Sequence, residues 1–95
     1  MARLAKRVYV DPIDTARLDT SIDQLAENTH VRIVDRSGAV VSGIVSERPV
    51  LQLFQTIDGV EGANAIVRIE HPDTQATDDY VWLDEIERLE RLDPL

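Results

Sequence analysis

The fold is decided by the stretch Val31–Thr56, VRIVDRSGAVVSGIVSERPVLQLFQT. It reads as a strand, a tight turn at Ser37-Gly38, and a long second strand with a bend. Gly43 has no side chain, so a strand can coil sharply there or let another backbone come close. Pro49 has no N–H to give to a ladder, which favours an edge, a bulge or a corner. We expect one bent strand that curls a small sheet into a barrel.

A helix is predicted before this stretch, over residues 12–27. Asp11 can accept hydrogen bonds from the first exposed amides, and Pro12 suits the first helical position because its missing N–H would be unpaired anyway. The helix has one apolar stripe, formed by Leu18, Ile22 and Leu25. A one-sided stripe predicts that the helix lies on a sheet or caps a barrel end.

The remaining strands are expected at about 30–35, 64–70 and 79–83, with a two-glycine turn between Ile57 and Gly62. Residues 85–92 fit either a helix or a short strand. We expect a single domain over residues 1–95 that is mainly β (α+β). In it a loosely docked or mobile tail (1–10) and the helix precede a strongly bent five-stranded antiparallel barrel over residues 30–91.

Composition indicates one small domain without disulfides. Ninety-five residues suffice for one modest core, and the absence of cysteine excludes disulfides and thiolate metal sites. The start MARLAKRVYV has charges but no apolar run behind them, so we expect no signal peptide and no membrane span. A cytoplasmic location is the expectation.

The net charge of −8 is unevenly distributed. Through Thr56 seven acidic residues face seven basic ones, whereas from Ile57 onward eleven acidic residues face three basic ones. Nucleic-acid binding usually requires a basic face, so this balance argues against a large phosphate-binding surface. The simpler interpretation, which we favour, is that the acidic residues keep a small protein soluble.

The pattern resembles the Sm-like fold. The segment HVRIVDRSGAVVSGIV is similar to the first Sm motif, with a hydrophobic strand, an Asp-x-x-Gly turn that ends at Gly38, and a further glycine at Gly43. The segment NAIVRIE is similar to the third strand of that motif, which typically begins with an asparagine, here Asn64. The segment VWLDEIERLE takes the place of the second motif.

More narrowly, the chain resembles a small family of uncharacterised proteobacterial proteins described as a variant of the Sm-like fold. The arrangement G-x-V-x-x-R-P…Q-x-F…D-G-x-E-G-x-N-A, read from Gly43 to Ala65, carries this resemblance. The resemblance covers about residues 11–91, and it implies the fold described above.

The resemblance to RNA-binding Sm proteins also implies a base pocket, from which this chain departs. An acidic residue and an asparagine hold the base in those proteins, and Asp58 and Asn64 would match them. No aromatic residue lies between these two to stack on a base. The Arg-Gly pair that completes the pocket is replaced by Leu83-Asp84-Glu85, whose carboxylates would repel a phosphate. We therefore carry over the fold and not the RNA site.

We expect no catalytic residues, no metal site, no cofactor and no enzymatic activity. Ser37, Ser42 and Ser46 lack the glycine-framed turn of a nucleophile. The only histidines are His30 and His71. Asp73, Asp78 and Asp79 lie near His71 in sequence, but two histidines without a fixed spacing are more often surface residues than ligands.

Phe54 and Trp82 are out of phase with the inward-facing residues of their strands. Large aromatic side chains most often belong to the core. Small barrels, however, leave strand edges that must be covered or paired. We predict that these two residues lie under the helix or at a self-association contact.

Two functions stay open. The first is a non-catalytic small barrel that acts through protein contacts, as a homodimer or small homo-oligomer that uses strand edges. The second is a weak single-stranded RNA-binding module, whose candidate contacts are Asn64, Arg32, Arg36, Arg48 and the basic start of the chain. The acidic second half and the missing Arg-Gly pair favour the first, with the protein partner unknown.

Overall fold

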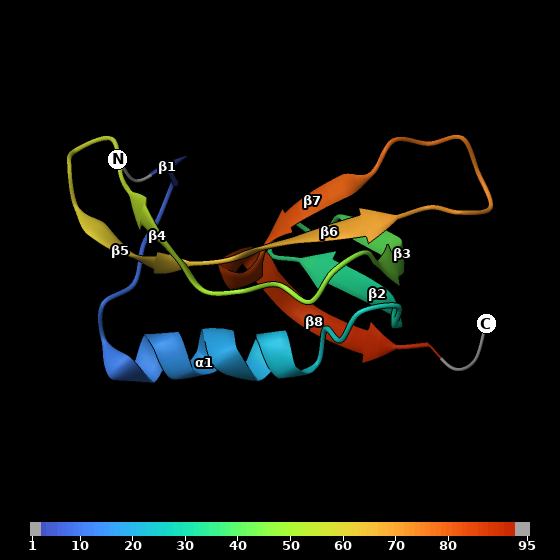
Figure 1. The fold of residues 1–95 in the computed structure, drawn as a ribbon, viewed down its shortest axis with the longest axis horizontal. Coiled ribbons are helices and arrows are strands. Elements are labelled where there is room, and N and C mark those ends of the chain that lie inside the picture. The colour runs from blue at the N-terminus through green and yellow to red at the C-terminus, as the bar shows by residue number, and fades with distance from the viewer. Residues whose placement is uncertain (1–2, 93–95) are drawn as a thin grey trace.

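The structure is a computed structural model that describes residues 3–92, with one helix and two β-sheets (Figure 1). Five strands form the larger sheet, in the order β7-β6-β3-β2-β8, and three form the smaller sheet, in the order β1-β4-β5. The two sheets lie towards opposite ends of the long axis in Figure 1. The fold is therefore α+β and mainly β, as expected.

The larger sheet is antiparallel throughout and consists of β2 (His30–Asp35), β3 (Val40–Val45), β6 (Ile66–Glu70), β7 (Asp79–Trp82) and β8 (Ile86–Arg91). Its edge strands β7 and β8 are joined by only three residues, the 3₁₀ turn η1 (Leu83–Glu85). The sheet must therefore curl until its edges approach each other at η1. Within the described residues β7 and β8 do not pair, so the expected barrel is not closed.

The prediction of a single bent strand over residues 39–56 is wrong. The chain forms β3 and then, after residues 46–51 that belong to no strand, β4 (Gln52–Gln55) in the smaller sheet. Pro49 lies buried in this connection, where it marks a change of sheet rather than a bend within one strand. Only β3 belongs to the larger sheet, whose strand order is β7-β6-β3-β2-β8.

The smaller sheet contains two strands that were not expected. Antiparallel to β4 runs β5 (Glu61–Asn64), and parallel to β4 runs β1 (Arg3–Leu4). The strand expected at 64–70 therefore begins at Ile66, because Asn64 ends β5. Residues 3–10 are not a loose tail, since β1 and a further bridge between Tyr9 and Ala63 fasten them to this sheet.

Helix α1 (Pro12–Asp23) begins where expected but ends four residues earlier. The Asp11 carboxylate accepts a hydrogen bond from the Ile13 amide at 2.9 Å, which caps the first turn. At the other end the amides of residues 24 and 25 bond to carbonyls three residues back, which tightens the last turn and ends the helix. Asn28 then takes a left-handed conformation, with φ 67°.

The predicted hairpin turn after β2 is confirmed. The Asp35 carboxylate accepts hydrogen bonds from the Ser37 hydroxyl at 2.6 Å and from the amides of Ser37 and Ala39 at 2.9 and 3.0 Å. These bonds, the hydroxyl first, lower the pKa of Asp35. Gly38 takes φ 91°, a conformation that glycine adopts without strain.

The core lies between α1 and the inner face of the curled sheet. It consists of Leu18, Ile22, Leu25, Val31, Ile33, Val45, Ala65, Val67, Ile69 and Leu83. The predicted helix stripe therefore faces the sheet. Of the two alternatives for residues 85–92, the strand is right, because β8 pairs with β2 and places Leu89 beside Ile33.

Gly43 allows β3 and β6 to approach closely. A Cβ atom at this position would lie 2.3 Å from the Glu70 carbonyl oxygen and 2.6 Å from Ile69 Cγ2. Cβ atoms in proteins do not come this close to other heavy atoms. Any residue larger than glycine at position 43 must therefore push the two strands apart. Of the two alternatives that the sequence left open at Gly43, a sharp coil of the strand or the close approach of another backbone, the structure shows the close approach.

We predict that Gly43→Ala lowers the free energy of unfolding by about 3 kcal/mol, because overpacking against backbone cannot be relieved by a side-chain rotation. Urea denaturation measures the change. Gly38→Asn is the matched control, since Asn tolerates a positive φ and a Cβ at Gly38 meets no atom within 4 Å. Equal stability of the two variants would contradict the prediction.

Candidate functional site

Asn64, the residue that matches the base-binding asparagine of Sm proteins, is occupied within the chain. Its side chain is buried, with 1% of the residue exposed. The Nδ2 group donates to the Arg7 carbonyl at 3.0 Å, and Oδ1 accepts from the Ala65 amide at 2.8 Å. A buried and hydrogen-bonded amide of this kind does not face a base. It fastens the start of the chain instead.

The other proposed RNA-contacting residues lie on segments other than β5, which carries Asn64. Arg32 lies exposed on β2, Arg36 donates from Nε to the Asp84 carbonyl at 3.0 Å, and Arg48 forms an ion pair with Asp23 at 2.7 Å. They come from three different segments, and two of them already have a partner. The side chains of Arg36 and Arg48 are thus partly occupied by contacts within the chain.

Asp58 is also separated from Asn64. It lies in the exposed turn that joins β4 and β5, where the Thr56 amide donates to the Val60 carbonyl at 2.9 Å. Asn64 is at the other end of β5, opposite Gln52. An acidic residue at the tip of a hairpin cannot share a base pocket with an asparagine at its base.

Residues 3–10, which we call the N-terminal arm, occupy the region around Asn64. Backbone hydrogen bonds link the arm to the smaller sheet: the Tyr9 amide donates to the Ala63 carbonyl at 2.9 Å, and the Ala63 amide donates to the Tyr9 carbonyl at 2.7 Å. Gly62 permits this approach, because a Cβ there would lie 2.9 Å from the Tyr9 carbonyl oxygen. The glycine that the sequence assigned to a turn is thus needed for contact with the arm.

The arm also reaches η1, the segment that replaces the second Sm motif's Arg-Gly pair. The Tyr9 hydroxyl donates to Asp84 Oδ2 at 2.9 Å, and Arg7 Nε lies 3.2 Å from the same oxygen. Only 6% of the Asp84 side chain is exposed, and the Arg7 guanidinium balances the charge of this carboxylate. Burial, and then the hydrogen bond to Asp84, raise the pKa of Tyr9.

A cleft of about 160 Å³ lies between α1 and η1, beside the arm. Its charged lining residues are Asp14, Arg17, Arg36 and Asp84. The two acidic and two basic groups balance, so the cleft has no clear preference for an anionic or a cationic ligand.

Phe54 and Trp82 lie against each other and join the two sheets. Phe54 belongs to β4 and Trp82 to β7, and their rings meet edge to face with centroids 5.0 Å apart. Phe54 is 1% exposed, and the Arg3 guanidinium covers its ring at 5.3 Å. Phe54 therefore lies inside the monomer rather than on its surface, whereas Trp82 is half-buried.

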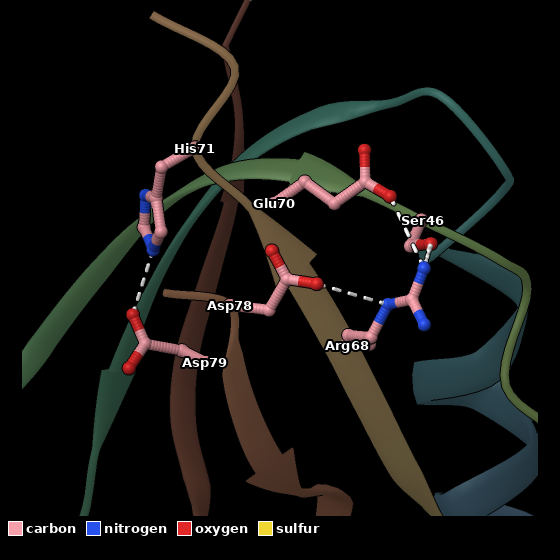
Figure 2. A network of polar contacts seen from close by, with 6 residues as sticks. All are labelled: Ser46, Arg68, Glu70, His71, Asp78 and Asp79. Atoms are coloured by element: carbon pink, nitrogen blue, oxygen red, sulfur yellow. Dashed lines mark hydrogen bonds and ion pairs between the residues drawn. The ribbon is translucent and has the colours of Figure 1, made fainter. Parts of the chain in front are cut away.

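Polar contacts fasten the loop between β6 and β7 (Figure 2). Arg68 donates to the Ser46 hydroxyl at 2.6 Å and contacts Glu70 and Asp78 at 3.3 Å each. His71 Nε2 lies 2.7 Å from Asp79 Oδ2. Within residues 3–92 no three histidine or acidic side chains gather in a way that could hold a metal ion. We assign these contacts to the loop's structure.

A family sequence model described as "Domain of unknown function (DUF3247)" matches residues 2–92. The chain belongs to the DUF3247 family. The DUF3247 chain is also similar to a solved structure, "The crystal structure of XC5848 from Xanthomonas campestris adopting a novel variant of Sm-like motif". The TM-score is 0.88 and the identity 28%, over 97% of this chain and 99% of the other. No curated protein matches.

These comparisons confirm the resemblance to an uncharacterised family with a variant Sm-like fold. The smaller sheet and the arm of this DUF3247 chain were not predicted from the sequence. The only local signal was the β-prone run Val8–Val10, because the partners of the arm lie 49 or more positions away. In the part of the chain that the structure describes, no helix is long and apolar enough to cross a bilayer.

The raised pKa of Tyr9 predicts a pH dependence of stability. A group whose folded pKa exceeds its unfolded value near 10 stabilises the fold below that pH, and the contribution is lost as pH rises through the folded pKa. Between about pH 9 and 11 the free energy of unfolding should fall more for the wild type than for Tyr9→Phe. Urea denaturation at each pH measures both, and parallel curves would contradict the assignment.

Proposed function

We propose that this DUF3247 protein is a non-catalytic Sm-like domain that acts through protein contacts and self-associates through an open sheet edge. The observation that carries the proposal is the curled but open larger sheet. Its edge strands β7 and β8 each have a neighbour on one side only within the described residues. Unpaired N–H and C=O groups along such an edge are a template for another strand.

Exposed apolar side chains support an interaction surface. Tyr80, on the edge strand β7, is 66% exposed, and Leu53 on β4 and Leu4 on β1 are also exposed. Leu4 and Leu53 lie on neighbouring strands of the smaller sheet. Apolar groups that gather on a surface often mark protein contacts. We also propose that the protein is cytoplasmic and needs no cofactor.

The alternative function, single-stranded RNA binding, has less support. Asn64 is buried under the arm, and Asp84 stands where an Sm protein would present a cation. The net charge of −8 adds a repulsive field that a phosphate backbone would have to overcome. Two of the three candidate arginines, Arg36 and Arg48, already have partners within the chain.

We predict that the protein self-associates reversibly in the micromolar range, while single-stranded RNA binds no more tightly than about 100 μM at moderate salt. Sedimentation velocity over a hundredfold range of protein concentration measures the first, and titration of labelled RNA at low and moderate salt measures the second. A monomer at every concentration, together with RNA binding that weakens steeply with salt, would reverse the assignment.

A further inference from the structure

The pairing of β8 with β2 shows which backbone groups of β8 point towards its free edge. On its other side β8 pairs with β2, where Glu90 lies opposite Arg32 and Leu89 opposite Ile33. The Leu92 amide donates to the His30 carbonyl at 2.8 Å. Because backbone groups alternate along an antiparallel strand, the amides and carbonyls of Leu89 and Arg91 point away from β2, towards the free edge.

The sequence of this edge, Ile86–Leu92 or IERLERL, is complementary to itself when it is reversed. A second copy that runs antiparallel about a two-fold axis at Leu89 places Leu89 opposite Leu89. It also gives the pairs Arg88–Glu90, Glu87–Arg91 and Ile86–Leu92, each occurring twice. Every charged residue then faces the opposite charge, and every apolar residue faces an apolar one.

Other registers of the same pairing bring like charges together. Opposite residues in an antiparallel ladder must both point their backbone groups at the partner or both point them away, so the two-fold axis passes through a residue. An axis at Arg88 would set Arg88 against itself, and an axis at Glu90 would set Glu90 against itself. Like charges directly opposite one another are destabilising. The axis at Leu89 is therefore selected.

Burial and sheet geometry agree with this register. Leu89 is half-buried at the edge of the core, so a partner's Leu89 would cover its exposed side. Arg88 and Glu90 lie on the outer face, with 68% and 43% of their side chains exposed and 3.9 Å between their charged groups. The irregularity of the ladder lies between Arg88 and Ile86, so the three central pairs fall in its regular part.

We propose that two copies of this chain join β8 to β8 about a two-fold axis at Leu89, forming one continuous ten-stranded sheet. This inference rests on the proposed self-association and names its surface and symmetry. A charged edge strand normally discourages pairing with other chains. In β8 the order of the charged residues disfavours pairing with other strands but matches a second copy of β8. A two-fold interface requires this self-complementarity.

A mixing experiment with the full chain tests the inference. Arg88→Glu sets glutamate against glutamate across the axis, and Glu90→Arg sets arginine against arginine. We expect each variant alone to raise the dimer dissociation constant roughly tenfold or more. An equimolar mixture should regain dimers, because one chain then carries glutamate at both positions and faces a chain that carries arginine at both. Sedimentation velocity measures the masses, and circular dichroism checks folding.

Arg17→Glu and Glu27→Arg are the matched controls, since they make the same charge changes on exposed residues in or near α1. They should leave the dimer unchanged. Glu90→Arg also faces Arg32 of its own chain. If that contact lowers the thermal midpoint, the pair Glu87→Arg and Arg91→Glu makes the same test.

The outcomes separate this inference from the proposed function. If the wild type forms dimers and the β8 variants dimerise as tightly as the wild type, association uses another surface and the β8 inference is wrong, while the proposed self-association stands. If the wild type is a monomer at every concentration, both are wrong. Dimers that reappear only on mixing establish the β8 pairing.

Discussion

The structure depends on the attachment of the N-terminal arm to the smaller sheet and to η1. Asn64, at the end of β5, holds the Arg7 carbonyl, and Asp84 in η1 holds the Tyr9 hydroxyl and the Arg7 guanidinium. Each of these contacts joins residues more than fifty positions apart. The arm therefore adds long-range contacts between two segments that also meet directly, through the Leu83 amide and the Ala65 carbonyl. Gly62 lets the arm pass close to β5.

The same attachment occupies the two segments that the resemblance to Sm proteins would assign to a base pocket. The two segments that would form that site, around Asn64 and at residues 83–85, are used to hold the chain's own start. A buried amide and a buried, neutralised carboxylate are stable because their partners are present within the chain. The larger sheet ends at the edge strands β7 and β8, which in the described part of the chain are each paired on one side only.

Local patterns in the sequence predicted the elements better than their connections. The capped helix start at Asp11, the turn at Asp35–Gly38 and the close approach at Gly43 follow from neighbouring residues, and the structure confirms them. Pro49 is compatible with either a bent strand or a change of sheet, so the division into β3 and β4 could not be read locally. The arm was missed because β1 has two residues and all its partners are distant in sequence.

Amide hydrogen exchange on the full chain tests most directly whether the arm is docked. Docking protects an amide only if it is hydrogen-bonded and shielded from water. We expect the amides of Ala5, Tyr9 and Ala63, which bond across the arm and the smaller sheet, to exchange as slowly as the other amides of β4 and β5. Exchange of the Ala5 and Tyr9 amides at the rate of an unstructured peptide, beside protected amides in β2 and β6, would contradict the account.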